Sequence, residues 1–135
     1  MEFSPCPCGS GKHYYQCCGP LHKGAAPPDA LTLMRSRYSA YATGNVDYII
    51  DTTHPDNVNF ATDKDTWRKD IEGFTHGTTF EGLEVLSSSS DGDDATVSFR
   101  AHMSQNGLNC SFSEKSRFRN VDGKWLYVDG KISPV

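Results

Sequence analysis

The sequence predicts an α+β protein in which a small cysteine-rich segment precedes helices and then a curved antiparallel sheet. Four of the five cysteines lie within the first eighteen residues. Helical periodicity follows in residues 29–72, and the second half alternates hydrophobic with polar residues between turn dipeptides. Helices that precede an antiparallel meander pack on one face of its sheet. The chain of 135 residues suits one domain with a small appendage.

The N-terminal segment is rich in glycine and proline and shows no amphipathic period. A segment of this size cannot bury a core of its own, and a metal ion is the usual substitute. We therefore expect residues 1–26 to form a metal-binding knuckle with a linker and residues 27–135 to form the α+β domain.

The first helix is expected over residues 29–44. Asp29 marks its start and Gly44 is a suitable C-terminal cap. Four side chains step by three and four along one face: Leu31, Met34, Tyr38 and Tyr41.

Two shorter helices are expected next. One covers residues 46–53 and must end before Pro55. The other covers residues 63–72 and is expected to stop at Gly73. A capping pair is suggested for its start by Thr62 and Asp65.

The second half predicts strands over residues 79–88, 95–104, 108–120 and 124–129. Their separators have turn chemistry: Asp91-Gly92-Asp93, Asn106-Gly107 and Asp122-Gly123. One face of the second strand should carry Val97, Phe99, Ala101 and Met103, and the other Ser98, Arg100 and His102. Residues 87–90 are expected to be a solvated loop.

The cysteines form two close pairs, Cys6 with Cys8 and Cys17 with Cys18, separated by eight residues. Four thiolates favour zinc and suit its tetrahedral geometry. Nearby glycines allow the tight turns that such a loop needs. We therefore expect one Zn²⁺ to be held by Cys6, Cys8, Cys17 and Cys18, the segment that we call the knuckle (residues 6–18).

Other roles for the cysteines remain open. A Cys₄ set also serves iron or an iron–sulfur cluster. A disulfide is less favoured in a reducing compartment, and a catalytic thiol is unusual where four thiolates converge. His22 is close enough in sequence to be a ligand and ranks below Cys18. A redox or metal-stress sensor is a further alternative.

Residues 6–19, CPCGSGKHYYQCCG, closely resemble the SEC-C motif, the zinc-binding tail of the SecA preprotein-translocase ATPase. That tail docks on the export chaperone SecB and is linked to ribosomes. The resemblance implies a docking module that captures a partner protein, either an export chaperone or a ribosome-associated factor. Its expected contact residues are Lys12, His13 and Lys23.

The rest of the chain resembles the YchJ-type SEC-C proteins, through LMRSRYSAY (residues 33–41), TTHP (52–55) and WLYVDG (125–130). This resemblance implies a domain like nuclear transport factor 2, a cone-like curved sheet with about three helices and a pocket between them. Domains of this fold often dimerise through the sheet, so a homodimer is a further expectation. Some relatives of the fold are dehydratases and isomerases that use Asp and His in the pocket.

Composition limits the other partners. The net charge of −4 argues against broad nucleic-acid binding, and no apolar run is long enough for a membrane span. The first residues lack the features of a secretory signal, so a cytoplasmic location is expected.

No catalytic constellation stands out in the sequence. Groups that could line a pocket are Arg35, Arg37, Tyr38, Tyr41, His54, Trp67, His76, His102, Glu114, Arg117, Trp125 and Tyr127. Each has an ordinary structural role as well: His54 is expected to fix a turn, Trp125 and Tyr127 to join the core, and Arg100 to pair with Glu114. We therefore favour a non-enzymatic zinc-binding adaptor, and the alternative is a lyase or isomerase that uses the cone pocket beside a structural zinc.

Overall fold

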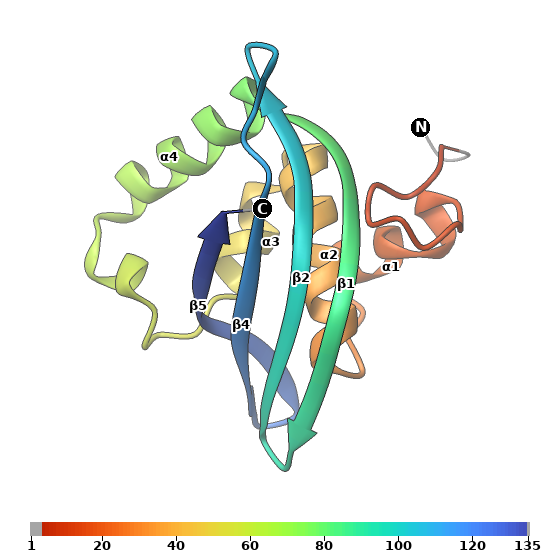
Figure 1. Cartoon of the computed structure of the whole chain (residues 1–135). Coiled ribbons are helices and arrows are strands. Elements are labelled where there is room, and N and C mark those ends of the chain that lie inside the picture. The colour runs from red at the N-terminus through yellow and green to blue at the C-terminus, as the bar shows by residue number, and fades with distance from the viewer. Residues whose placement is uncertain (1–3, 135) are drawn as a thin grey trace.

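The computed structural model describes residues 4–134 as a small N-terminal unit packed beside a curved sheet that helices cover on one face (Figure 1). The helical elements are η1 (Tyr14–Gln16), α1 (Cys18–His22), α2 (Ala30–Thr43), α3 (Val46–Asp51), η2 (Val58–Ala61) and α4 (Lys64–Gly77). The strands are β1 (Thr79–Asp91), β2 (Asp94–Gln105), β3 (Leu108–Asn109), β4 (Phe112–Val121) and β5 (Lys124–Pro134). The predicted α+β class with a curved antiparallel sheet is confirmed.

Helix α2 has the ends that the sequence predicts. The Asp29 carboxylate accepts a hydrogen bond from the Thr32 amide at 2.8 Å, which satisfies one free donor of the first turn. Gly44 ends the helix in the left-handed region, with φ of +77°. Helix α3 follows at once, capped by the Asn45 side chain, and ends at Asp51, two residues before the predicted end.

Helix α4 is longer than predicted. It passes through Gly73 and ends at Gly77. The reason is packing, because Phe74 contacts Tyr41 and Phe80 at ring-centroid distances of 5.7 and 5.8 Å. The predicted capping pair at its start is also wrong: the carboxylate that accepts from the Thr66 amide belongs to Asp63.

The sheet has the strand order β1-β2-β4-β5, with antiparallel pairing throughout and β3 paired to β2. Residues 87–90, expected to be a loop, lie in β1 and pair with β2. The predicted strand 108–120 is interrupted, because β3 ends at Asn109 and β4 begins at Phe112. At this break the Cys110 amide donates to the Met103 carbonyl at 3.0 Å.

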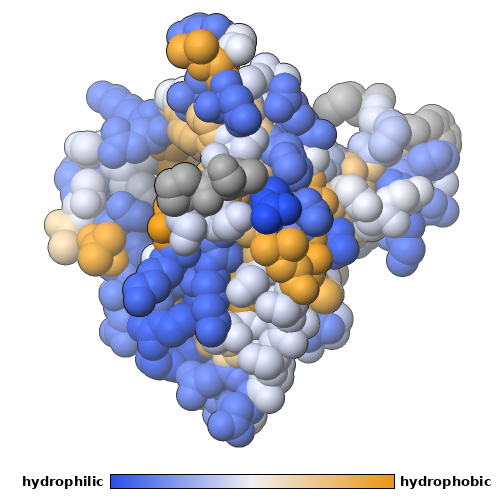
Figure 2. Space-filling view, viewed as in Figure 1, coloured by the Kyte–Doolittle hydropathy of each residue, from blue (hydrophilic) through white to orange (hydrophobic). Residues whose placement is uncertain are grey.

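The concave face of the sheet carries the core. Val97, Phe99, Ala101 and Met103 are buried as predicted. The opposite face of β2 is partly exposed and faces the viewer in Figure 2, where the surface is mainly hydrophilic with isolated hydrophobic side chains. In Figure 1, α2 and α3 lie behind the sheet, α4 lies toward the β5 edge, and α1 lies beyond the β1 edge.

Among residues 4–134, no helix has the length and hydrophobicity needed to cross a membrane.

Candidate metal centre and cone pocket

The four cysteines of the knuckle converge on one point. Their Sγ atoms all lie within 4.8 Å of one another, and two of the separations are 3.6 Å (Cys8 to Cys17) and 4.0 Å (Cys17 to Cys18). Zinc–sulfur bonds of about 2.3 Å in a tetrahedron place sulfurs about 3.8 Å apart. A disulfide would require about 2.05 Å. The donor set therefore fits a soft, tetrahedral metal ion.

Local backbone bonds create this convergence. The Cys6 amide donates to the Lys12 carbonyl at 2.9 Å, and the Gly9 amide donates to the Cys6 carbonyl at 3.1 Å. These bonds close a tight loop in which Gly9 has a φ of +78°, a value that suits glycine. The second pair follows from η1, because the Cys17 amide donates to the Tyr14 carbonyl at 3.1 Å and α1 begins at Cys18.

Polar groups lie beside the sulfurs. The hydroxyl of Ser10 lies 3.1 Å from the Cys17 sulfur, and the hydroxyl of Ser39 lies 3.3 Å from the Cys6 sulfur. Hydrogen bonds from Cys18 and then from Ser10 lower the pKa of Cys8, whereas the bond to Cys8 and then burial raise the pKa of Cys18. Cys8 therefore ionises before Cys18, and a thiolate is the form that binds metal.

The knuckle is held against α2. The Arg35 side chain donates from Nη1 to the Cys8 carbonyl at 2.8 Å, so this predicted pocket residue serves the metal loop instead. Gly19 fits closely beneath Tyr14, where an added Cβ would lie 2.9 Å from the Tyr14 carbonyl oxygen. The knuckle is thus part of a packed surface.

His22 lies outside the sulfur cluster, as its lower rank among the candidate ligands anticipated. The Tyr14 hydroxyl donates to its Nδ1 at 2.6 Å, and its Nε2 donates to the Ser36 carbonyl at 2.9 Å. Its ring also contacts Tyr48, with centroids 4.7 Å apart. Burial lowers the pKa of His22, because the charged ring would lose its hydration, and the hydrogen bond to the Ser36 carbonyl offsets part of this shift.

The three residues predicted to contact a partner are all exposed. Lys12 and His13 lie in the loop between the cysteine pairs, and Lys23 follows α1. The His13 ring is 5.9 Å from the ring of Tyr15, which is 43% exposed. None of these side chains belongs to the sulfur cluster.

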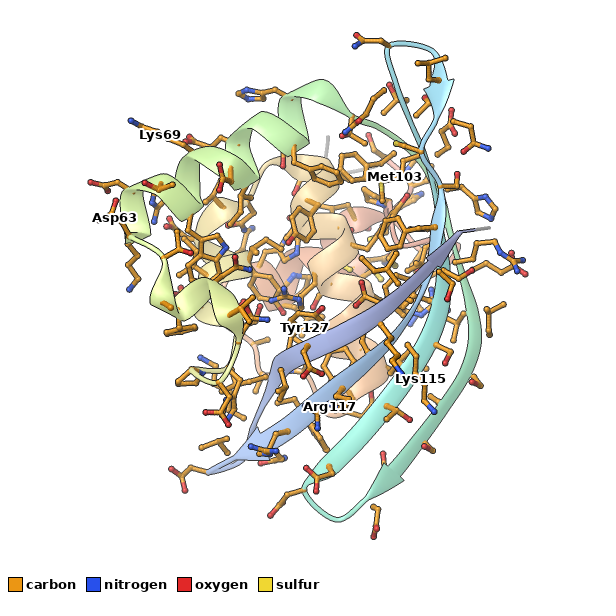
Figure 3. All side chains as sticks on the ribbon, turned by 60° about the vertical axis from the view of Figure 1, so that its left-hand side comes forward. Asp63, Lys69, Met103, Lys115, Arg117 and Tyr127 are labelled. Atoms are coloured by element: carbon orange, nitrogen blue, oxygen red, sulfur yellow. The ribbon has the colours of Figure 1, made fainter. Side chains whose placement is uncertain are left out.

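A cavity of about 410 Å³ lies between the concave face of the sheet and helices α2 and α4. It contains six of the predicted pocket residues: Arg37, Tyr38, Tyr41, Trp67, Glu114 and Tyr127. Figure 3 shows Tyr127 and Met103 on the inner side of the sheet, facing the helices, whereas Asp63 and Lys69 lie on the outer side of α4. Tyr127 packs against the core, as predicted, and it also lines this cavity.

The other pocket candidates lie elsewhere. The His54 ring nitrogen accepts from the Asp56 amide at 2.9 Å, which confirms the predicted turn. Trp125 is buried in the core, as predicted, and His76 is exposed. Two candidates contact carboxylates on the outside: His102 is hydrogen-bonded to Glu84 at 3.4 Å, and Arg117 forms an ion pair with Asp129 at 2.6 Å.

The predicted pair between Arg100 and Glu114 is wrong. Arg100 pairs with Glu84 at 3.4 Å, because Glu84 is directly opposite it on β1. Glu114 lies opposite Phe99 on the concave face instead. A shift of one residue in a strand reverses the face on which a side chain lies, and the sequence does not fix the pairing register to that precision.

Several cavity residues were missed as site residues. Ser116, Asn59 and Asp70 carry no pattern that separates them from surface positions, and the phenylalanines of the wall have the same alternation as core residues. The sequence feature that could have indicated the cavity is the large number of aromatic residues in both halves of the domain. Such residues are equally compatible with a filled core.

A tetrathiol knuckle packed against a cone-like α+β domain defines a class of two-part proteins with a candidate metal site. A family model described as the YchJ middle NTF2-like domain matches residues 29–130, and a SEC-C motif model matches residues 4–20. The chain belongs to the YchJ-type family with an NTF2-like domain and a SEC-C motif.

Relatives resemble the chain over nearly its full length. A UPF0225 protein of Xanthomonas campestris is 44% identical over 129 residues, which cover 94% of each chain. The solution structure of a SEC-C motif containing protein from Rhodopseudomonas palustris is 37% identical, with a TM-score of 0.82 and coverage of 96% of this chain and 98% of that one. A crystal structure of a SEC-C motif containing protein from Psychrobacter arcticus is 29% identical, with a TM-score of 0.80 and coverage of 99% and 85%.

Proposed function

We propose that the chain is a zinc-binding adaptor whose knuckle docks a partner protein in the cytoplasm. The observation that carries the proposal is the convergence of four thiols in a loop whose outer side chains are exposed. A site closed by four cysteines has no open position for substrate, so its metal has a structural role. The ion would shape a surface that other molecules can recognise.

Charge supports a partner with an acidic surface. Residues 1–26 carry Lys12 and Lys23 against Glu2, a net charge of +1, and the rest of the chain carries 11 basic and 16 acidic residues, a net charge of −5. A basic tip on an acidic body orients an acidic partner toward the knuckle. By analogy with the SecA tail, we propose an export chaperone or a ribosome-associated protein as this partner.

The proposal is tested with purified export chaperone and purified ribosomes as separate probes. We expect the double variant Lys12→Glu with Lys23→Glu to bind its partner about tenfold more weakly than the unaltered protein, because both charges lie at the contact. The matched control is Lys64→Glu with Lys69→Glu, which reverses two exposed charges on α4. Binding that survives the knuckle reversal, or that falls equally in the control, contradicts the proposal.

Point variants are preferable to deletion of residues 1–26. Deletion would uncover Ser36, Ser39 and Arg35 on α2, which now contact the N-terminal unit. A lost interaction would then have two explanations. The two charge variants leave these contacts in place.

The second candidate function is a lyase or isomerase that works in the cavity beside a structural zinc. The observation that favours it is a half-buried acid–phenol pair, in which the Tyr127 hydroxyl donates to Glu114 at 3.0 Å. Burial and then the charge of Glu114 raise the pKa of Tyr127, so the phenol stays protonated and can donate. Among the described residues, no histidine lines this cavity.

A further inference from the structure

The cavity between sheet and helices has the size and lining of a small-molecule site, and the role proposed for the knuckle does not use it. Its volume of about 410 Å³ falls in the range of about 300–1,000 Å³ that small ligands occupy. Its wall is largely aromatic, with Trp67 on α4 and Phe80, Phe99 and Phe112 on the strands. An apolar group of moderate size would bury its surface here.

One basic side chain in this wall is incompletely paired. Arg37 is only 8% exposed, and its hydrogen bonds all come from Nη1, to the Ile49 carbonyl and to the hydroxyls of Thr52 and Thr53 at 2.8–3.2 Å. In the described part of the chain it has no carboxylate partner, and its Nε and Nη2 have no acceptor. Arg37 lines the cavity, and neither nitrogen is among the fully enclosed polar atoms that lack a partner. A buried guanidinium with two free donors favours a carboxylate.

One acidic side chain is incompletely paired in the same cavity. Glu114 accepts hydrogen bonds from the hydroxyls of Ser116 and Tyr127, both at Oε2. Within residues 4–134 its Oε1 has no donor and its charge has no ion-pair partner. This carboxylate favours a ligand group that is positively charged and can donate.

Tyr127 links the two charges. The Arg37 guanidinium carbon lies 4.5 Å from the centre of the Tyr127 ring, and the hydroxyl of the same ring binds Glu114. A positive group therefore contacts the ring of Tyr127 and a negative group contacts its hydroxyl, and all three side chains line the cavity. A ligand with one charge would leave the other charged group of the wall unpaired and would itself lie near a like charge, which is unfavourable.

We propose that this cavity binds a free α-amino acid with an aromatic or branched apolar side chain. The ligand carboxylate pairs with Arg37, its ammonium group pairs with Glu114, and its side chain packs against the aromatic wall. This inference is independent of the role proposed for the knuckle, since no residue of the cavity belongs to residues 1–26.

The test is titration of the full chain with three compounds of nearly equal shape, followed by calorimetry or NMR. L-phenylalanine carries both charges, 3-phenylpropanoate lacks the ammonium group, and 2-phenylethylamine lacks the carboxylate. We expect saturable binding of L-phenylalanine, with each singly charged compound about tenfold weaker or more. The inference is overturned if L-phenylalanine and L-leucine both fail to saturate a site, or if a singly charged compound binds as tightly as L-phenylalanine.

Variants locate the bound molecule. Glu114→Gln keeps the size of the side chain and its acceptor for Tyr127 but removes the charge, so L-phenylalanine should bind about tenfold more weakly while 3-phenylpropanoate binds no worse. The Gly130→Ala variant tests the position of the Glu114 carboxyl group without any change of charge, because an added Cβ would collide with that group. The matched control is Lys115→Gln, the next residue of β4, which is exposed. Unchanged L-phenylalanine affinity in Glu114→Gln, or an equal loss in Lys115→Gln, rejects this site.

Discussion

At the residue scale, His22 shows how one side chain joins the N-terminal unit to the domain. The neutral ring forms a hydrogen bond with each of two neighbours, since Nδ1 accepts from the Tyr14 hydroxyl and Nε2 donates to the Ser36 carbonyl. Protonation would turn Nδ1 into a second donor and would bury a charge. This contact therefore depends on a histidine that stays neutral in the folded protein.

The first prediction concerns pH. Burial holds the pKa of His22 in the folded chain below its unfolded value of about 6.5, so the unfolded chain binds the proton first as pH falls. The free energy of unfolding should therefore decrease as pH falls through about 6.5, and should be unaffected by this group above that pH. In urea unfolding with excess zinc, His22→Gln should weaken this dependence. The control His102→Gln changes a partly exposed histidine, and an equal change there would contradict the prediction.

At the element scale, the second prediction concerns which carboxylate caps the start of α4, that of Asp63 or that of Asp65. Asp63→Ala should lower the free energy of unfolding by about 1 kcal/mol, because the Asp63 carboxylate accepts from the amide and the hydroxyl of Thr66. Asp65→Ala should cost about 0.5 kcal/mol or less, because Asp65 acts only through its charge in the first turn. Chemical denaturation of the two variants decides between them. A larger loss in Asp65→Ala would restore the cap that the sequence pattern suggested.

The elements also show where sequence patterns are sufficient. Asp29 and Gly44 bound α2 correctly because caps act on the backbone within a few residues. The predicted helix end at Gly73 was wrong because a glycine inside a helix costs only about 1 kcal/mol. The burial of Phe74 against Tyr41 and Phe80 offsets this cost. The extent of α4 was thus decided by contacts distant in sequence.

The two candidate sites also differ in how far local sequence determines them. The cysteine pairs meet through a loop of local hydrogen bonds, so their spacing and family motif were sufficient to predict the cluster. The cavity is formed by α2, α4 and the four long strands, and its acidic group depends on the register that directs Glu114 inward. Sequence listed Arg37, Glu114 and Tyr127 among candidates but could not show that they meet.

At the scale of the whole molecule, residues 4–134 contain two buried clusters, and Leu83 packs against both. The smaller contains Cys6, Cys8 and Cys18, with Tyr14, Cys17 and Leu83 packed around it. The larger fills the space between the helices and the sheet. The smaller cluster has too little apolar surface to hold its loop in the absence of an ion, whereas the larger one needs no metal.

Metal removal should therefore separate the two units. After treatment with a strong chelator, we expect amide hydrogen exchange to lose protection in residues 4–24, while β2 and β4 stay protected because they carry the larger cluster. Added zinc should restore the protection, and elemental analysis of the released ion should find zinc. Loss of protection in β2 together with the knuckle would show that the metal holds the whole chain. Release of iron would contradict zinc as the ion while leaving the tetrathiol site in place.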